Sequence, residues 1–81
     1  MISILVAGPG CYNCRKLKAM CKEIVEEKNI DAAISEVSDM NQIAALSVMM
    51  TPGLLINGTL VSSGRVPSKE KLEQWIVEAT N

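Results

Sequence analysis

The stretch Gly8-Pro9-Gly10-Cys11-Tyr12-Asn13-Cys14-Arg15-Lys16 marks the point where an apolar run ends and a helical pattern begins. Cys11 falls at or just before the first helical turn, where free backbone N–H groups and the positive end of the helix dipole stabilise a negative charge. Cys14 follows about one turn later on the same side, roughly 5–6 Å away between Cβ atoms, so a disulfide is within reach. The stretch therefore predicts a reactive thiol pair.

Basic residues surround the second half of this stretch. Arg15, Lys16 and Lys18 follow Cys11, and no acidic residue occurs before Glu23. This local field is expected to lower the pKa of the Cys11 thiol. The same three side chains are explained equally well as an ordinary solvated helix face or as residues that steer a partner towards the thiols.

The composition of the 81-residue chain limits the functions open to it. At this length we expect one domain, residues 1–81. With no Phe, one Tyr and one Trp, the chain lacks an aromatic platform for single-stranded nucleic acid. Its net charge of −1, with acidic and basic residues interleaved, gives no basic patch for phosphates or lipid headgroups. We therefore expect neither a nucleic-acid nor a membrane partner.

The chain has three cysteines and no histidine. An odd number of cysteines with a C-x-x-C spacing favours thiol chemistry over a secreted disulfide framework. The apolar run at residues 2–7 is too short for a signal peptide or a membrane span, which favours a cytoplasmic location. The missing histidine excludes a Cys–His nucleophile and a Cys/His zinc site.

The first two elements flank the cysteine pair. Residues 2–7 form a continuous aliphatic run, as expected for a central strand buried on both faces. From Tyr12 to Lys28 the apolar residues recur with helical spacing, which predicts an amphipathic helix. Extending its apolar stripe backwards from Leu17 reaches Cys14. Cys14 should therefore face the protein, whereas Cys11 stays accessible.

The middle of the chain predicts a strand and a short helix. Residues 31–37 alternate in part between apolar and polar, and the preceding helix makes a parallel crossover from the first strand the natural connection. Asp39-x-x-Gln42 resembles a capping box, which predicts a short helix running to about Leu46 or Val48. Pro52 then stops regular structure and favours an extended conformation for the residue before it.

The last third of the chain predicts a hairpin and a closing helix. Leu54–Ile56 and Thr59–Val61 flank Asn57-Gly58, the pair that most readily adopts the positive φ angles of a type I′ turn. Ser68 can cap the helix that follows, whose apolar residues repeat with helical spacing to about Thr80. The predicted order is βαβαββα, an α/β fold with a four-stranded mixed sheet and helices on both faces.

In its predicted element order and its motifs, the chain resembles the thioredoxin/glutaredoxin-fold family over essentially its whole length. It is most similar to the small archaeal and bacterial thioredoxin-like proteins known as redox-active disulfide proteins. Three features carry the resemblance: the Cys11-x-x-Cys14 motif at the start of the first helix, Thr51-Pro52 before the third strand, and Asn57-Gly58 in the hairpin.

The resemblance implies a thiol–disulfide oxidoreductase that reduces protein disulfides. Cys11 matches the exposed nucleophile and Cys14 the resolving thiol. Pro52 matches the proline that is cis in this fold, and Thr51 the residue whose backbone pairs with a substrate strand. Tyr12 takes no family role beyond forming the wall beside Cys11, and the candidate substrate-binding residues are Tyr12, Asn13, Thr51 and Pro52. The implied partners are disulfide-containing proteins and an electron donor similar to thioredoxin reductase. The protein itself is expected to be a monomer that holds no cofactor and no metal.

The sequence also departs from both branches of the family. Residues 2–7 contain no acid corresponding to the buried acid beneath the thioredoxin site, so the proton acceptor for Cys14 is not identified. Residues 63–68 contain no acid of the kind that binds the γ-glutamyl group in glutaredoxins, so the resemblance does not extend to glutathione binding.

Other interpretations of these residues remain open at this point. Two thiolates at C-x-x-C spacing could carry Cu(I) or Zn(II), although metal-carrier domains of this size usually run βαββαβ. The fold could also serve as a binding module without turnover. Thr51-Pro52 could be a trans turn, and Cys21 is expected to be a small core residue. The residues expected to fill the core include Met20, Met40, Met49, Met50 and Trp75, with Met50 a candidate to line the groove beside Cys11.

Overall fold

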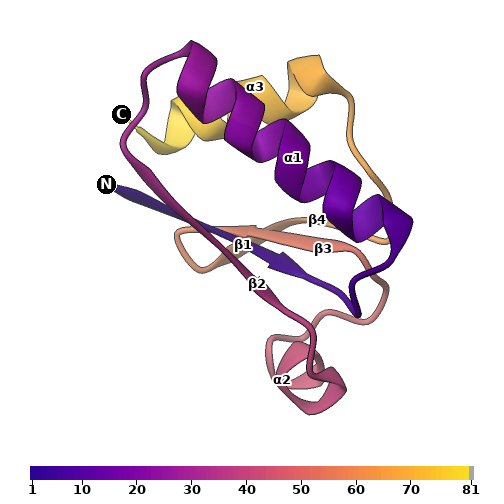
Figure 1. Cartoon of the computed structure of the whole chain (residues 1–81). Helices are drawn as coiled ribbons and strands as arrows, with labels where there is room; N and C mark the ends of the chain where they lie inside the picture. The colour runs from indigo at the N-terminus through magenta and orange to yellow at the C-terminus, as the bar shows by residue number, and fades with distance from the viewer. Residues whose placement is uncertain (81) are drawn as a thin grey trace.

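The computed structural model describes residues 1–80 and contains seven elements in the predicted βαβαββα order. Their bounds are β1 Ile2–Ala7, α1 Tyr12–Glu27, β2 Ala32–Val37, α2 Met40–Ala45, β3 Gly53–Ile56, β4 Thr59–Ser63 and α3 Lys69–Ala79. Figure 1 shows α1 and α3 side by side over one face of the sheet, with α2 on the other side. The predicted α/β architecture is confirmed.

The four strands form one mixed sheet in the order β2-β1-β3-β4. β1 pairs with β2 in parallel, with Ile4 opposite Ile34, and with β3 in antiparallel, with Ile4 opposite Ile56. The β3–β4 hairpin is antiparallel and has a register shift between Leu54 and Leu55. β1 is therefore a central strand, and the residues that follow it leave the sheet at its carboxyl end, between β2 and β3.

The larger core cluster lies between the sheet and the α1–α3 layer. Alternate residues of the central strands point to this side, where they meet the apolar stripes of both helices. The buried members are Ile2, Ile4, Val6, Leu17, Cys21, Ile24, Val25, Leu54, Ile56, Leu72 and Ile76. Cys21 is fully buried here, so the prediction that it is a core residue is confirmed.

A smaller cluster lies on the opposite face, beneath α2, and consists of Ala7, Ile43, Val48 and Leu55. α2 has only six residues and covers this face at one end. Leu5 is therefore only half-buried and Ser3 is exposed. The expectation that the first strand is buried on both faces holds at its carboxyl end and is wrong at its start.

The helix caps and the hairpin turn occur at the residues that the sequence predicts. Asp39 caps α2 by accepting hydrogen bonds from the N–H groups of Asn41 and Gln42, and Ser68 caps α3 by accepting one from the N–H of Lys71. Asn57 and Gly58 have positive φ angles of 51° and 83°, as the hairpin prediction requires.

Three of the four methionines expected in the core lie at the surface instead. Met40, Met49 and Met50 are exposed, and 93% of Met49 is accessible to solvent. The expectation of core packing is wrong for them because α2 ends at Ala45, so Met49 and Met50 lie in the connection to β3. Val48 turns inwards from this connection instead.

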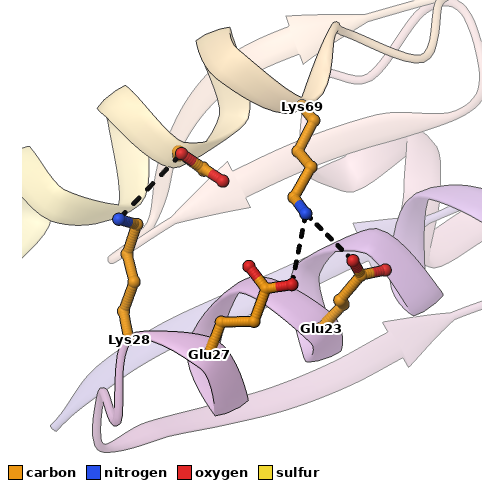
Figure 2. A network of polar contacts seen from close by, with 5 residues as sticks. Glu23, Glu27, Lys28 and Lys69 are labelled. Atoms are coloured by element: carbon orange, nitrogen blue, oxygen red, sulfur yellow. Dashed lines mark hydrogen bonds and ion pairs between the residues drawn. The ribbon is translucent and has the colours of Figure 1, made fainter.

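Ion pairs join the two helices of the outer layer at the surface (Figure 2). Lys69 Nζ of α3 lies 2.9 Å from Glu23 Oε1 and 3.2 Å from Glu27 Oε1, both on α1. Lys28 Nζ, just after α1, lies 4.0 Å from Glu73 Oε2 of α3. No helix within residues 1–80 combines the length and apolar character needed to cross a bilayer.

Candidate dithiol site

The backbone between β1 and α1 places the cysteine pair at the carboxyl end of the central strand. Gly8 continues the β1–β2 pairing, with its N–H donating to the Val37 carbonyl at 2.8 Å. The chain then turns through Gly10, whose φ of 85° favours glycine. Cys11 follows as the N-cap of α1, in an extended conformation, and its carbonyl accepts the first helical hydrogen bond from Arg15 at 3.0 Å.

The two sulfur atoms face one another. Cys11 Sγ lies 2.7 Å from Cys14 Sγ and accepts a hydrogen bond from the backbone N–H of Cys14 at 3.3 Å. Both are free thiols; Cys11 is exposed and Cys14 retains only 3% of its accessible surface. The predicted difference between an accessible first cysteine and an inward-facing second one is therefore confirmed.

The thiol pKa values shift in opposite directions. The pKa of Cys11 is lowered, chiefly by the side-chain hydrogen bond from Cys14 and then by the Cys14 backbone N–H. The pKa of Cys14 is raised, first by burial and then by its hydrogen bond to Cys11. When the pair loses a proton, Cys11 is therefore expected to ionise first, with the S–H of Cys14 placed to donate to its thiolate.

The basic side chains contribute differently from what the sequence suggested. Hydrogen bonds, not neighbouring cations, lower the Cys11 pKa. Arg15 instead donates a hydrogen bond to the Gly10 carbonyl at 3.3 Å, which stabilises the loop before the helix. Lys18 pairs with Glu36 of β2 at 3.1 Å. The local-field explanation of the lowered pKa is therefore replaced by direct hydrogen bonding within the cysteine pair.

The loop before β3 lies against the buried cysteine. The Thr51–Pro52 peptide bond is cis, Pro52 is buried and Thr51 is half-buried. A Cβ atom built on Gly8 would lie 3.7 Å from Thr51 Cβ and would collide with Cys14 Sγ, which places Gly8, Cys14 and Thr51 together. The Thr51 loop therefore lies close to the segment that carries Gly8 and Cys14, although the two are far apart in sequence.

Contacts from the end of β4 hold this loop in place, and sequence reasoning did not identify them. The N–H of Gly64 donates to the Pro52 carbonyl at 3.0 Å, and Ser63 Oγ donates to the Met50 carbonyl at 3.0 Å. Gly64 has a φ of 82°. A positive-φ glycine after the last strand was the available signal, but its partner depends on the tertiary fold.

The remaining predicted site residues lie at the surface. Tyr12 and Asn13 are the first two residues of α1 and are exposed beside Cys11. Within the part of the chain that the structure describes, no group of three or more His, Cys, Asp or Glu side chains is placed to hold a metal ion. The soft-metal interpretation would therefore depend on Cys11 and Cys14 alone.

A helix-capping thiol of lowered pKa, paired with a buried thiol beside a cis-proline loop on a βαβαββα fold, defines a thioredoxin-like protein. Comparison with known proteins agrees: the chain belongs to the thioredoxin domain family, whose sequence profile matches residues 2–77. This family and its members' names support a redox function of the thioredoxin type.

Two archaeal relatives match over almost the same length. The chain is 38% identical over 74 residues to a protein named thioredoxin from Methanothermobacter thermautotrophicus, covering 91% of this chain and 96% of that one. It is also 38% identical over 74 residues to a protein named thioredoxin from Methanocaldococcus jannaschii, covering 91% of this chain and 85% of that one.

Proposed function

We propose that this protein is a dithiol–disulfide oxidoreductase that reduces protein disulfides through Cys11 and Cys14. The observation that supports it best is the pairing of an exposed sulfur at a helix N-cap with a buried sulfur 2.7 Å away. The pKa of the exposed sulfur is lowered, which favours the thiolate form that acts as the nucleophile. The names of the two archaeal relatives support the same reaction class.

The reaction proceeds in two exchanges. The Cys11 thiolate attacks one sulfur of the target disulfide, the target S–S bond breaks, and the released target thiolate takes a proton. Cys14 then loses its proton and attacks Cys11 Sγ, which breaks the mixed disulfide and releases the second target thiolate to be protonated. The target gains two electrons and two protons, and the protein is left with a Cys11–Cys14 disulfide.

The substrate meets the protein at the loops around Cys11. Thr51, which precedes the buried cis-Pro52, lies close to Gly8 and Cys14, whereas Tyr12 and Asn13 are exposed beside Cys11. Extended backbone next to a reactive thiol suits pairing with a substrate strand. We assign these four residues to substrate contact.

The cycle needs an electron donor to restore the dithiol. We propose a flavin-dependent reductase similar to thioredoxin reductase as this donor, and a monomer acting in the cytoplasm as the working form. Three free thiols suit a reducing compartment. The direct test of the donor is reoxidation of its reduced cofactor by the oxidised protein.

Two single variants test the division of roles. Cys11→Ser should abolish reduction of a disulfide-bonded substrate such as insulin, because no accessible thiolate remains. Cys14→Ser should accumulate a covalent mixed disulfide, visible on a non-reducing gel, because resolution is lost. Cys21→Ala is the matched control and should retain activity, since that thiol is buried in the core.

Some outcomes would contradict the assignment. Equal residual activity in Cys11→Ser and Cys14→Ser would remove the difference in roles. Stoichiometric Cu(I) or Zn(II) in protein purified without oxygen, together with no disulfide reduction, would favour the metal-carrier interpretation. An intact protein that no donor reduces and that reduces no disulfide would favour a binding module.

A further inference from the structure

We propose that Gly8 is a positioning residue for the reaction: its lack of a side chain leaves room for Cys14 Sγ at the position from which it contacts Cys11. The positioning role, unlike the contact itself, rests on the proposed oxidoreductase function. Neither the motif nor the resemblance assigns a role to residue 8.

The space above Gly8 is occupied by the resolving sulfur. A Cβ atom at residue 8 would overlap Cys14 Sγ, while it would lie 3.4 Å from Cys14 Cβ and 3.7 Å from Thr51 Cβ, both ordinary contacts. The sulfur is therefore the atom that forbids a side chain here. Gly8 is not among the residues with positive φ, unlike Gly10, so the requirement for glycine comes from space.

The backbone of Gly8 cannot retreat to make room. Gly8 is buried and its N–H donates to the Val37 carbonyl at 2.8 Å. The preceding residue, Ala7, is fully buried in the central strand and pairs with Val37 on one side and Gly53 on the other. Moving residue 8 would break the sheet pairing at the end of β1.

The displaced sulfur would have to leave Cys11. Cys14 is fixed on α1 by the fully buried Leu17 one turn later, so its side chain, and not the helix, would move. Its sulfur already lies 2.7 Å from Cys11 Sγ and cannot come closer without forming a bond. A side chain at residue 8 therefore weakens the hydrogen bond to the Cys11 thiolate and spoils the narrow geometry needed for ring closure.

A double-mutant cycle on folding stability tests the contact. In the reduced protein, Gly8→Ala should lower the folding equilibrium constant by about tenfold or more, as overpacking does. In a Cys14→Ala background, the same change should cost less than about threefold, because the obstructing atom is gone. Equal costs in the two backgrounds would overturn the proposal.

Gly53→Ala is the matched control for this cycle. A Cβ there would lie 2.6 Å from Val48 Cγ1, so the clash is similar but involves no sulfur. Its cost should be the same with Cys14 and with Ala at that position. If Gly8→Ala does not fold, folding of Gly8→Ala/Cys14→Ala supports the proposal, and failure of both overturns it.

A chemical readout separates positioning from packing. In Gly8→Ala the pH midpoint for alkylation of Cys11 should rise, and the mixed disulfide with substrate should persist longer; Gly53→Ala should change neither. A stability coupling without these two changes would reduce Gly8 to a packing residue and overturn the positioning role. An inactive wild-type protein that still shows the coupling would instead count against the proposed function alone.

Discussion

The two sulfur atoms at residues 11 and 14 differ in how readily they ionise, because Cys11 lies at an exposed helix cap and Cys14 is one turn further into the protein. Burial opposes ionisation of Cys14 and leaves it protonated. Its S–H then favours the thiolate form of Cys11. In the proposed reaction, one side chain would therefore supply both the resolving thiol and the stabilisation of the first nucleophile.

This coupling predicts the effect of removing Cys14 on its neighbour. In wild-type protein the alkylation rate of Cys11 should reach half its maximum below the pH typical of a cysteine thiol. Cys14→Ala should move that midpoint upwards, since the largest cause of the lowered pKa is lost while the backbone N–H remains. Iodoacetamide labelling against pH measures it, and an unchanged midpoint would contradict the hydrogen-bond explanation.

The third cysteine predicts a pH dependence of stability. Burial raises the pKa of Cys21 to about 12, whereas an unfolded cysteine ionises near about 8.5. Between these values the folded state keeps a proton that the unfolded state has lost. Ionisation of Cys21 therefore has no effect on stability below about pH 8.5. Above that pH it lowers the free energy of unfolding by up to ~1.4 kcal/mol per pH unit.

Urea unfolding of wild-type protein and Cys21→Ala at several pH values isolates the effect, because Cys11 and Cys14 contribute equally to both. The wild-type protein should be the more stable at pH 7, where it keeps its core packing. That advantage should shrink above about pH 8.5. A constant difference up to pH 10 would show that Cys21 ionises as readily in the folded state.

At the residue scale, helical spacing was enough to predict which cysteine is accessible and which is buried. The cause of the lowered Cys11 pKa was not predictable, because it depends on the 2.7 Å separation between side chains. The contact between Gly8 and Cys14 was equally hidden. It forms only when the end of β1, the start of α1 and the Thr51 loop are packed together.

Capping and turn residues determine where the helices and the hairpin of this small chain begin and end. Asp39 and Ser68 cap helices where the sequence places them, and Asn57-Gly58 turns the hairpin. Asn57 also links the hairpin to β1: its N–H donates to the Ser3 carbonyl at 2.8 Å, and its Oδ1 accepts from the Ser3 N–H at 2.9 Å. The turn therefore holds the central strand as well as its own pair.

The hairpin predicts how substitutions at Gly58 rank. Its φ of 83° is costly for a residue with a Cβ atom, so Gly58→Ala should lower the free energy of unfolding by about 1–2 kcal/mol. Gly58→Asn should cost less, because Asn tolerates positive φ. Urea unfolding measures both. An alanine variant as stable as the asparagine variant would show that the turn adapts to the substitution.

The sequence predicted every element but not all of their limits. α2 ends at Ala45, before the predicted Leu46 or Val48, because Ser47 adopts a positive φ of 65° that the sequence does not signal. β4 runs on to Ser63 across a register shift that no local pattern indicates. The exposure of Met49 and Met50 follows from this short α2, and composition alone could not separate it from core packing.

The whole molecule is stabilised mainly from one side, where α1 and α3 cover the sheet and the larger cluster lies. The smaller cluster beneath α2 supports the edge that carries Cys11 and the Thr51 loop. The site therefore lies at the carboxyl end of the central strand, fixed by both clusters. The sequence predicted helices on both faces but not which of them share a face, and the ion pairs between α1 and α3 depend on how the two helices cross.

The α1–α3 layer allows its two kinds of contact to be compared. Leu72 of α3 is fully buried, so Leu72→Ala should lower the free energy of unfolding by about 2–5 kcal/mol. Lys69 bridges Glu23 and Glu27 at the solvent-exposed surface of the same layer (Figure 2). Exposed ion pairs contribute little and are screened by salt, so Lys69→Met, which keeps the apolar stem, should cost far less.

Urea unfolding of both variants in low and high salt separates these contributions. The effect of Lys69→Met should diminish as salt is added, because the field of its ammonium group at Glu23 and Glu27 is screened. The effect of Leu72→Ala should not, because it reflects lost packing against the sheet. If Lys69→Met proved as damaging as Leu72→Ala at both salt concentrations, the ion-pair network would be holding α3 in place, and the apolar core would not suffice.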